Sequence, residues 1–274
     1  MKITFWNKIK ILFEVYKCLP QIPMKYKLYI LIKPLESTRY TEFAYLLDFI
    51  NNCSDCNFKK ILDISSPFLM SYILSKYSHV IKTDINEEER IFIKENKHLS
   101  FQIQDATKLA YKNNYFDMVY SISVIEHIFN NYLAAINEMI RVVKNGGYIY
   151  LTFPVSNNYT EEWLNSDIYS HQGKSDNKTF FQYRFDDQKF NEIINKLSNV
   201  KIISHSIYWE RNNGLYNRYI EKIRKKTPIS HLNFLKDSLL HFYYGFTLLK
   251  SEPEKFINAK SFGNVSIILK KIVK

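Results

Sequence analysis

Glycine is scarce in this 274-residue chain, which has six glycines and none before Gly146. The first half therefore lacks the residue for which a positive φ carries no steric cost, and this excludes a glycine-rich dinucleotide loop there. The gap matters at "ILDISSPFLM", residues 61–70, because an apolar run that ends in Asp usually leads into such glycines. Ser65, Pro67 and Leu69 stand in their place.

Cysteine is scarce as well. Three cysteines give no even disulfide framework, and Cys53 and Cys56 form an isolated CxxC pair. Zinc would need two further ligands, and a redox pair would stand at a helix start after a strand. This pair instead follows a helical pattern and precedes a strand, so we expect plain loop residues in a reduced, cytoplasmic protein.

Long apolar runs are missing, since none approaches the roughly 20 residues of a membrane span. Lys8, Lys10 and Glu14 interrupt the apolar stretch near the N-terminus, which argues against a signal peptide. Apolar residues there recur at helical spacing, and a basic amphipathic helix of this kind packs on its own domain or lies on a membrane surface. The sequence favours packing on the domain. The apolar positions are Trp6, Ile9, Phe13 and Tyr16.

The net charge of +11 brings nucleic acid and anionic membranes into question as partners. The lysines are dispersed along the chain, and the densest basic run is only Arg224-Lys225-Lys226. This distribution favours a solvated surface over a binding stripe.

Short β-rich runs alternate with helical patterns after two N-terminal helical stretches, the second over 40–51. Strands separated by helices imply right-handed crossovers and a parallel sheet covered on both faces. The sequence therefore predicts one α/β domain. The expected strands are 60–64, 79–84, 100–104, 116–121, 148–153, 200–209 and 264–272, and the expected helices include 69–77, 87–96, 131–143 and 186–197.

Acidic residues follow three consecutive expected strands, at the sheet edge where such folds bind ligands. Asp84 ends the second strand in "VIKTDIN", where a carboxylate can accept hydrogen bonds from both hydroxyls of a ribose. Asp105 follows the third in "FQIQDATKL", where it could receive the exocyclic amine of an adenine. Asp is common in turns, but Asp63, Asp84 and Asp105 in register, followed by "FDMVYSISVIEHI", form a stronger signal.

At this point the chain resembles the class I methyltransferases that use S-adenosylmethionine. "YFDMVYSISVIEHI" (Tyr115–Ile128) looks like their fourth strand and its LEH-like triplet. "NEMIRVVKNGGYIYLTFP" (Asn137–Pro154) looks like their helix, Lys-Pro-Gly-Gly turn and fifth strand, with Asn145 replacing the proline. "FFQYRFDDQKFNEII" (Phe180–Ile194) is similar to the segment before the following helix. The resemblance covers about 39–209 and implies a doubly wound, mostly parallel seven-stranded sheet with an antiparallel last strand.

The resemblance also implies a pocket for S-adenosylmethionine. By matched position, Asp84 would hold the ribose and Asp105 the adenine. The serines of the turn would lie beside the methionine portion, above Asp63, and the end of the fourth strand would cover the sulfonium. The implied cofactor-binding residues are Asp63, Ser65, Ser66, Asp84, Asp105, Ser121 and Ile122.

Two physical points compensate for the missing glycines. S-adenosylmethionine has no pyrophosphate, so the backbone of the turn need not cradle phosphate. Pro67 fixes φ near −65° and biases Ser66 toward extended geometry, so the turn can be rigid without glycine. The serine hydroxyls could then bond a carboxylate or an amine of the ligand. Binding is the prediction, and a relic that binds no cofactor is the alternative.

His127, in "IEHI", stands where an acceptor could meet the methyl group. An unperturbed pKa near 6.5 suits a general base, although the matching histidine of the family is mainly a structural hydrogen-bonding residue. Some quinone-pathway relatives bind a metal through a Glu three residues before the Glu-His pair. Ser123 stands there, so we expect no metal.

Two segments extend the core, which is expected over 58–154 within a single domain of 1–274 whose N-terminal helices occupy 1–52. The first, 155–183, is polar with interspersed aromatic residues, and it is either a lid or a structured surface loop. The second, 211–262, contains two helical patterns, and its Leu-, Phe- and Tyr-rich helix could cover the pocket, pair with another subunit or touch lipid.

The favoured function is methyl transfer to O or N of a small-molecule, sugar or lipid-linked acceptor. Charge prompts RNA methylation as an alternative, but no Asn-Pro-Pro-Tyr-like motif follows the fourth strand and no appended RNA-binding module is evident. The missing glycines prompt a second alternative, a catalytically inactive interaction protein. The sequence makes no prediction of oligomeric state.

Overall fold

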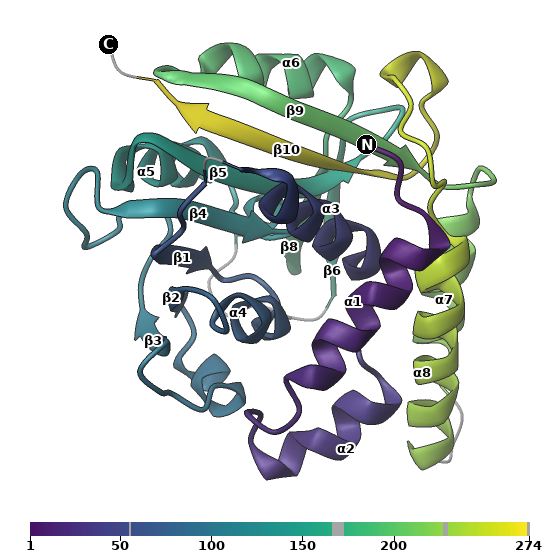
Figure 1. Ribbon diagram of the computed structural model, residues 1–274. Helices are drawn as coiled ribbons and strands as arrows, with labels where there is room; N and C mark the ends of the chain where they lie inside the picture. The colour runs from purple at the N-terminus through teal and green to yellow at the C-terminus, as the bar shows by residue number, and fades with distance from the viewer. Residues whose placement is uncertain (55, 166–172, 227–229, 273–274) are drawn as a thin grey trace.

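A seven-stranded sheet forms the centre of the computed structural model, which describes residues 1–274 except 55, 166–172, 227–229 and 273–274 (Figure 1). The strand order is β3-β2-β1-β4-β5-β10-β9, and β10 runs antiparallel to both of its neighbours. The predicted doubly wound sheet with an antiparallel last strand is confirmed. The strands are β1 (Lys60–Ile64), β2 (His79–Asp84), β3 (Leu99–Ile103), β4 (Phe116–Ile122), β5 (Val143–Val155), β9 (Val200–Trp209) and β10 (Gly263–Lys271).

Helices cover both faces of the sheet, because the strands carry buried apolar side chains on both sides. One apolar cluster joins the sheet to the N-terminal helices, α4 and α8, and a second joins it to α5 and α6. The helices are α1 (Phe5–Lys17), α2 (Met24–Ile32), α3 (Arg39–Asn52), α4 (Phe68–Leu74), α5 (Tyr132–Val142), α6 (Asp187–Lys196), α7 (Leu215–Arg224) and α8 (Ser230–Thr247), with short 3₁₀ turns η1 (Glu87–Phe92), η2 (Ile125–His127) and η3 (Phe256–Asn258).

Two helix predictions are wrong. The N-terminal region holds three helices, because α2 follows α1 within the stretch before 40. The helix expected over 87–96 is only the 3₁₀ turn η1, after which the chain extends and Asn96 bridges to Leu99.

The helix α1 packs against α3 and α4 through a different face from the one expected. Trp6 and Phe13 of the predicted stripe are 69% and 61% exposed. The buried face instead carries three aliphatic residues and Lys8, whose Nζ donates to the carbonyl of Gly245 in α8 at 2.8 Å. Burial lowers the pKa of Lys8 to about 8.

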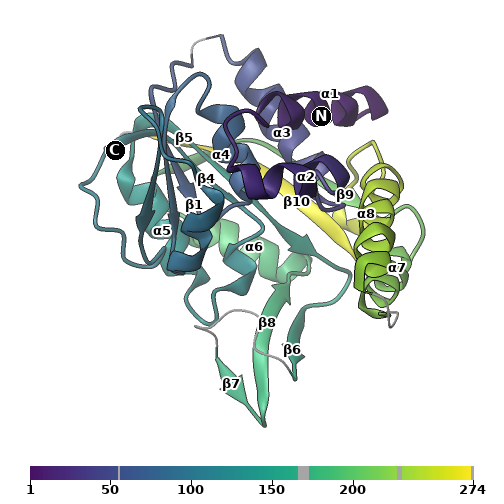
Figure 2. The same ribbon diagram turned by 90° about the horizontal axis from the view of Figure 1, so that it is seen from below.

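The two added segments form separate substructures (Figure 2). Within 155–184, β6 (Thr160–Leu164), β7 (Lys174–Ser175) and β8 (Lys178–Arg184) make a small antiparallel sheet that projects from the body. Within 211–262, α8 packs beside α1 and α3, and a Cβ at Gly245 would meet the Tyr40 ring at 2.6 Å. No helix in the described part of the chain is long and apolar enough to cross a membrane.

Candidate active site

A cavity of about 600 Å³ opens at the carboxyl ends of β1 to β4, the edge that the sequence indicated. Its floor is formed by strand ends and the turn into α4, and its roof by Tyr29 and Ile30 of α2 with the linker 33–39. Two predicted site residues, Asp63 and Ser121, are buried and do not line the cavity. The other six do line it: Ser65, Ser66, Asp84, Asp105, Ile122 and His127.

The turn after β1 forms without glycine because Ser65 itself takes a left-handed conformation, with φ at +48°. Its N–H donates to the Thr83 carbonyl at 2.9 Å. Pro67, with φ at −53°, is the N-cap residue of α4, as expected for a residue that stiffens the turn. Left-handed φ costs an L-residue roughly 1–2 kcal/mol, so the rest of the turn must hold Ser65 in place.

Ser66 supplies part of that restraint. Its N–H donates to Asp63 Oδ1 at 2.9 Å, and its hydroxyl accepts the Ile122 N–H at 2.9 Å and donates to the Ile64 carbonyl at 3.3 Å. The Ser66 hydroxyl thus ties β1 to the end of β4 and keeps one acceptor lone pair. Contact of the two serine hydroxyls with a ligand stays a prediction. The Ser65 hydroxyl takes part in none of these bonds, and Ser65 lines the cavity.

A buried lysine, missed by the sequence reasoning, completes the support of the turn. Register places Asp63 beside Lys82 of β2 on one side and beside Tyr120 of β4 on the other. Lys82 Nζ donates to the Ser66 carbonyl at 2.6 Å and lies 3.9 Å from Asp63 Oδ2, which also accepts from the hydroxyls of Tyr120, at 2.8 Å, and Ser71. Both charged side chains are 0% exposed. Burial raises the pKa of Asp63 in spite of Lys82 and these donors.

The two carboxylates assigned to the nucleoside line the cavity from consecutive strands. Asp84 Oδ1 accepts the Asn86 N–H at 2.9 Å, and Asp105 Oδ1 accepts the Thr107 N–H at 2.8 Å and its hydroxyl at 2.7 Å. Each residue thus also caps its own turn. A carboxylate has a second oxygen with which it can accept hydrogen bonds from a ligand, so turn capping and ligand binding are compatible here.

A second buried carboxylate orders the loop after β4. Glu42 of α3 is 0% exposed, and its Oε1 accepts from Ser123 and Thr152 at 2.6 Å each and from Asn264 at 3.0 Å. Its Oε2 accepts from Arg39, which lines the cavity, at 2.5 Å. Burial alone would raise the pKa of Glu42, but the Arg39 guanidinium and the two hydroxyls outweigh it and hold that pKa below its usual range.

His127 lines the cavity from η2 and is held by the projecting sheet. Its Nδ1 lies 2.6 Å from the Phe181 carbonyl, which can only accept, so Nδ1 carries the proton and Nε2 carries the lone pair. Burial lowers the pKa of His127 to about 4. The assumed value near 6.5 is therefore wrong, and the imidazole is neutral at physiological pH.

The two added segments contribute to the site indirectly. Among the residues that the structure describes, none from 155–183 or 211–262 lines the cavity. Instead, β8 offers the Phe181 carbonyl to His127, and its Tyr183 hydroxyl accepts the Asn130 N–H at 3.1 Å, beside the lining residues Phe129 and Asn131.

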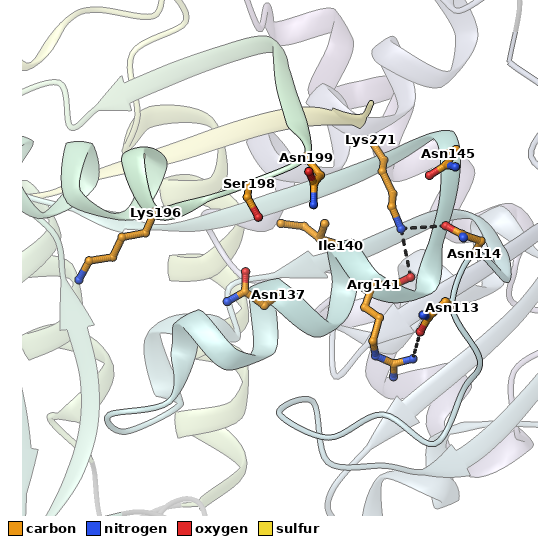
Figure 3. Close-up of a pocket in the computed structure, with 10 residues that line it drawn as sticks. All are labelled: Asn113, Asn114, Asn137, Ile140, Arg141, Asn145, Lys196, Ser198, Asn199 and Lys271. Atoms are coloured by element: carbon orange, nitrogen blue, oxygen red, sulfur yellow. Dashed lines mark hydrogen bonds between the residues drawn. The ribbon is translucent and has the colours of Figure 1, made fainter. Parts of the chain in front are cut away.

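Another cavity, of about 460 Å³, lies near the amino ends of β4 and β5 (Figure 3). Two of its three lining cations are engaged within the protein. Lys271 donates to Asn114 Oδ1 and to two carbonyls, and the Arg141 guanidinium bonds Glu138 and Asn113. It lies away from the strand ends that carry the predicted residues, and we assign it no part in the site.

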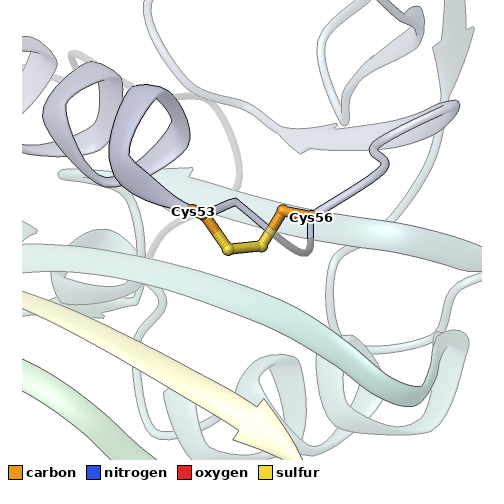
Figure 4. Close-up of a disulfide and its surroundings, with 2 residues drawn as sticks. All are labelled: Cys53 and Cys56. Carbon is orange, nitrogen blue, oxygen red and sulfur yellow. A yellow bond between two sulfur atoms is a disulfide. The ribbon is translucent and has the colours of Figure 1, made fainter.

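Cys53 and Cys56, expected to be plain loop residues, form a disulfide between α3 and β1 (Figure 4). The chain turns sharply after α3 and brings the two Cα atoms to 5.3 Å, within the range that a disulfide bridges. The prediction for this pair is wrong, and the cytoplasmic location stays a prediction.

Comparison with known proteins bears on these features. Residues 65–151, from the turn after β1 to the middle of β5, match the model of the family described as "Methyltransferase domain". This stretch of the chain is therefore similar to a methyltransferase domain.

One curated protein and two solved structures show how this chain relates to others. It is 28% identical over 185 residues to a tRNA (carboxymethyluridine(34)-5-O)-methyltransferase of Arabidopsis thaliana, a match that covers 60% of the chain and 45% of that protein. The chain spans about half the length of the curated relatives that it matches.

Two solved structures share the fold. The [4+2]-cyclase SpnF superposes with a TM-score of 0.55 at 12% identity, over 88% of the chain and 85% of its own. Coclaurine N-methyltransferase, solved with N-methylheliamine and S-adenosylhomocysteine, gives 0.54 at 14% identity, over 99% and 89%. Since one of them is named for a cyclisation, the shared fold does not by itself fix the reaction.

Proposed function

We propose that the chain is a methyltransferase that uses S-adenosylmethionine, bound in the cavity at the carboxyl ends of β1 to β4. The observation that carries the proposal is the meeting of the turn after β1 with Asp84 and Asp105 in one cavity. The 600 Å³ volume lies within the roughly 300–1,000 Å³ of small-molecule sites. The residues present therefore fit the cofactor.

In this proposal Asp84 accepts hydrogen bonds from the ribose hydroxyls and Asp105 accepts from the adenine amine. Ser65 and the backbone of its turn contact the methionine portion, and Ile122 lies toward the sulfonium. When bound, the cofactor supplies a methyl group already activated on sulfur. The protein is left to align the nucleophile, exclude water and, where the acceptor is a hydroxyl or ammonium group, accept a proton.

His127 is the candidate proton acceptor. Its neutral state, with the lone pair on Nε2, satisfies the first requirement of a base, whereas its pKa of about 4 makes it a weak one. The same bond to the Phe181 carbonyl also suits a purely structural role. The acceptor proposed is a small molecule, a sugar or a lipid-linked group methylated at O or N, entering beneath the roof formed by Tyr29, Ile30 and the 33–39 linker.

RNA methylation is a second candidate, favoured by the similarity to the Arabidopsis tRNA enzyme. Transfer of labelled methyl groups to total tRNA, compared with transfer to small-molecule and lipid extracts, separates the two candidates. Incorporation into tRNA alone would replace the small-molecule proposal.

Calorimetric titration with S-adenosylmethionine and S-adenosylhomocysteine tests the cofactor proposal. Asp84→Ala should weaken binding by about 1.5–3 kcal/mol, the scale of hydrogen bonds to a charged group. Asp48→Ala, which removes a half-buried carboxylate of α3 away from the cavity, should leave affinity unchanged. Failure of the folded wild type to bind either compound would support the inactive interaction protein instead.

A further inference from the structure

The outward face of α1 combines exposed aromatic side chains with lysines. Trp6, Lys10, Phe13 and Lys17 follow one another at the spacing i, i+4, i+7, i+11, which places them on one side of the helix. All four are exposed, and none of them belongs to the buried face of α1 described above.

The neighbouring helix α2 repeats this combination. Met24 and Leu28 are 77% and 68% exposed, and Leu31 is exposed on the same side of the helix. Lys25 and Lys27 lie beside these residues. We call the exposed side chains of α1 and α2 together the N-terminal surface.

The helix α8 extends the N-terminal surface. The exposed Leu239 and Phe242 lie on one side of α8, and the Phe242 ring lies 5.1 Å from that of Phe246. Phe246 in turn lies 5.1 Å from Phe5 of α1. The three helices stand together at one side of the molecule in both views (Figures 1 and 2). So large a cluster of exposed apolar side chains marks a surface that another body covers.

The charge of this region indicates which body that is. Residues 1–33 contain seven lysines and one glutamate. Lys8 is buried, and Lys2 and Lys17 pair with Glu252 and Glu14, so the surplus positive charge of this region rests on Lys10, Lys25, Lys27 and Lys33. A second copy related by a two-fold axis would set the surface against itself and bring two such charges together. An anionic lipid surface offers opposite charge to the lysines and an apolar layer to the aromatic and aliphatic side chains.

We propose that the N-terminal surface docks on membranes that contain anionic lipids, with Trp6, Phe13 and Leu28 entering the headgroup boundary. Because α2 also supplies Tyr29 and Ile30 to the cavity lining, docking places this wall of the proposed active site close to the lipid. Docking itself does not depend on methyl transfer, so each can fail without the other.

Co-sedimentation of the full chain with phosphatidylcholine vesicles, with and without phosphatidylserine, tests the proposal. The wild type should bind only the vesicles that contain phosphatidylserine, and binding should weaken as salt rises. Lys10→Gln with Lys25→Gln and Lys27→Gln should lower the partition coefficient about a hundredfold, because each lysine near an anionic surface contributes about fivefold. The control Lys97→Gln with Lys174→Gln and Lys201→Gln removes equal charge from exposed positions elsewhere and should change binding little.

The apolar component has its own readout. Trp6 is the exposed member of the three tryptophans, so its fluorescence should shift to the blue on anionic vesicles, and Trp6→Phe should lose the shift while keeping co-sedimentation. Trp6→Ser with Phe13→Ser should abolish binding, whereas Ile203→Ser with Ile257→Ser, two exposed positions elsewhere, should not. Two results would overturn the proposal. One is an equal loss of vesicle binding from both lysine triple variants. The other is a wild type that binds no vesicles but forms a dimer in light scattering, which Trp6→Ser with Phe13→Ser dissociates.

Discussion

Lys82→Met should destabilise the folded chain by about 3–5 kcal/mol, because it leaves the buried Asp63 carboxylate without its cation. At the observed 3.9 Å between Nζ and Oδ2, the attraction is about 4 kcal/mol for an effective dielectric constant near 20. The 2.6 Å bond from Nζ to the Ser66 carbonyl is lost as well, while methionine keeps most of the apolar stem. S-adenosylmethionine affinity should fall with stability, since the same bond holds the turn.

The loss should depend on pH. Burial already raises the folded pKa of Asp63 above its unfolded value, so the ionised carboxylate costs stability at pH above the unfolded pKa. Without Lys82 the folded pKa rises further. As pH falls through that range, Asp63 takes up a proton and the cost disappears. The destabilisation by Lys82→Met should therefore be larger at about pH 8 than at about pH 5.

Urea unfolding followed by circular dichroism measures both effects. Asp63→Asn combined with Lys82→Met should cost less than the sum of the single changes, since neither charge is then left unpaired. Lys250→Met, which removes a half-exposed ion pair with Glu254, should cost less than about 1 kcal/mol and serves as the control. Additive costs at Asp63 and Lys82, or a loss that does not change with pH, would refute the role given to this pair.

Two further predictions concern the turn and the histidine. Ser65→Gly should raise the free energy of unfolding in urea by up to about 1 kcal/mol, because glycine adopts the left-handed φ without strain, although the unfolded chain also gains conformational freedom. Leu69→Gly removes a buried helical side chain and should lower the free energy of unfolding by about 3–5 kcal/mol. Glycine at 65, 67 and 69 together should not improve cofactor affinity, and a tenfold gain by titration would mark the turn as a degraded glycine loop. If His127 is the base, His127→Asn should lower turnover roughly 100-fold and leave cofactor affinity intact. The rate of the wild type should then fall on the acid side near the lowered pKa of about 4. If His127 is structural, melting temperature, affinity and rate should fall together; the weak basicity favours this second outcome.

The sheet could be predicted from sequence because its strands are short apolar runs separated by helices, a pattern that needs only local information. Four of the carboxyl-end residues, Ser65, Asp84, Asp105 and Ile122, reach one cavity for the same reason: parallel strands bring their ends to one edge. The strand bounds 60–64, 79–84 and 200–209 match the structure to the residue.

Buried charges could not be predicted, because their partners are distant in sequence. Glu42 accepts from Asn264, 222 positions away, and nothing in "RYTEFAYLL" distinguishes it from an exposed helical glutamate. Lys82 interrupts the apolar run "HVIKTD", a local signal that could have been read as a buried cation. The helix α2 lacks a side-chain cap at its start, so the sequence gives no local signal for its beginning, and its contribution to the cavity was not predicted.

The buried Glu42 carboxylate affects which fragments of this chain should be stable. The family match begins at Ser65, yet the acceptor for the donors of Ser123, Thr152 and Asn264 comes from α3, before the matched region. A fragment that starts at β1 would leave these three donors facing the interior, at about 1–3 kcal/mol each. Although α3 lies before the matched region, its loss should therefore destabilise the edge of the sheet that carries the proposed site.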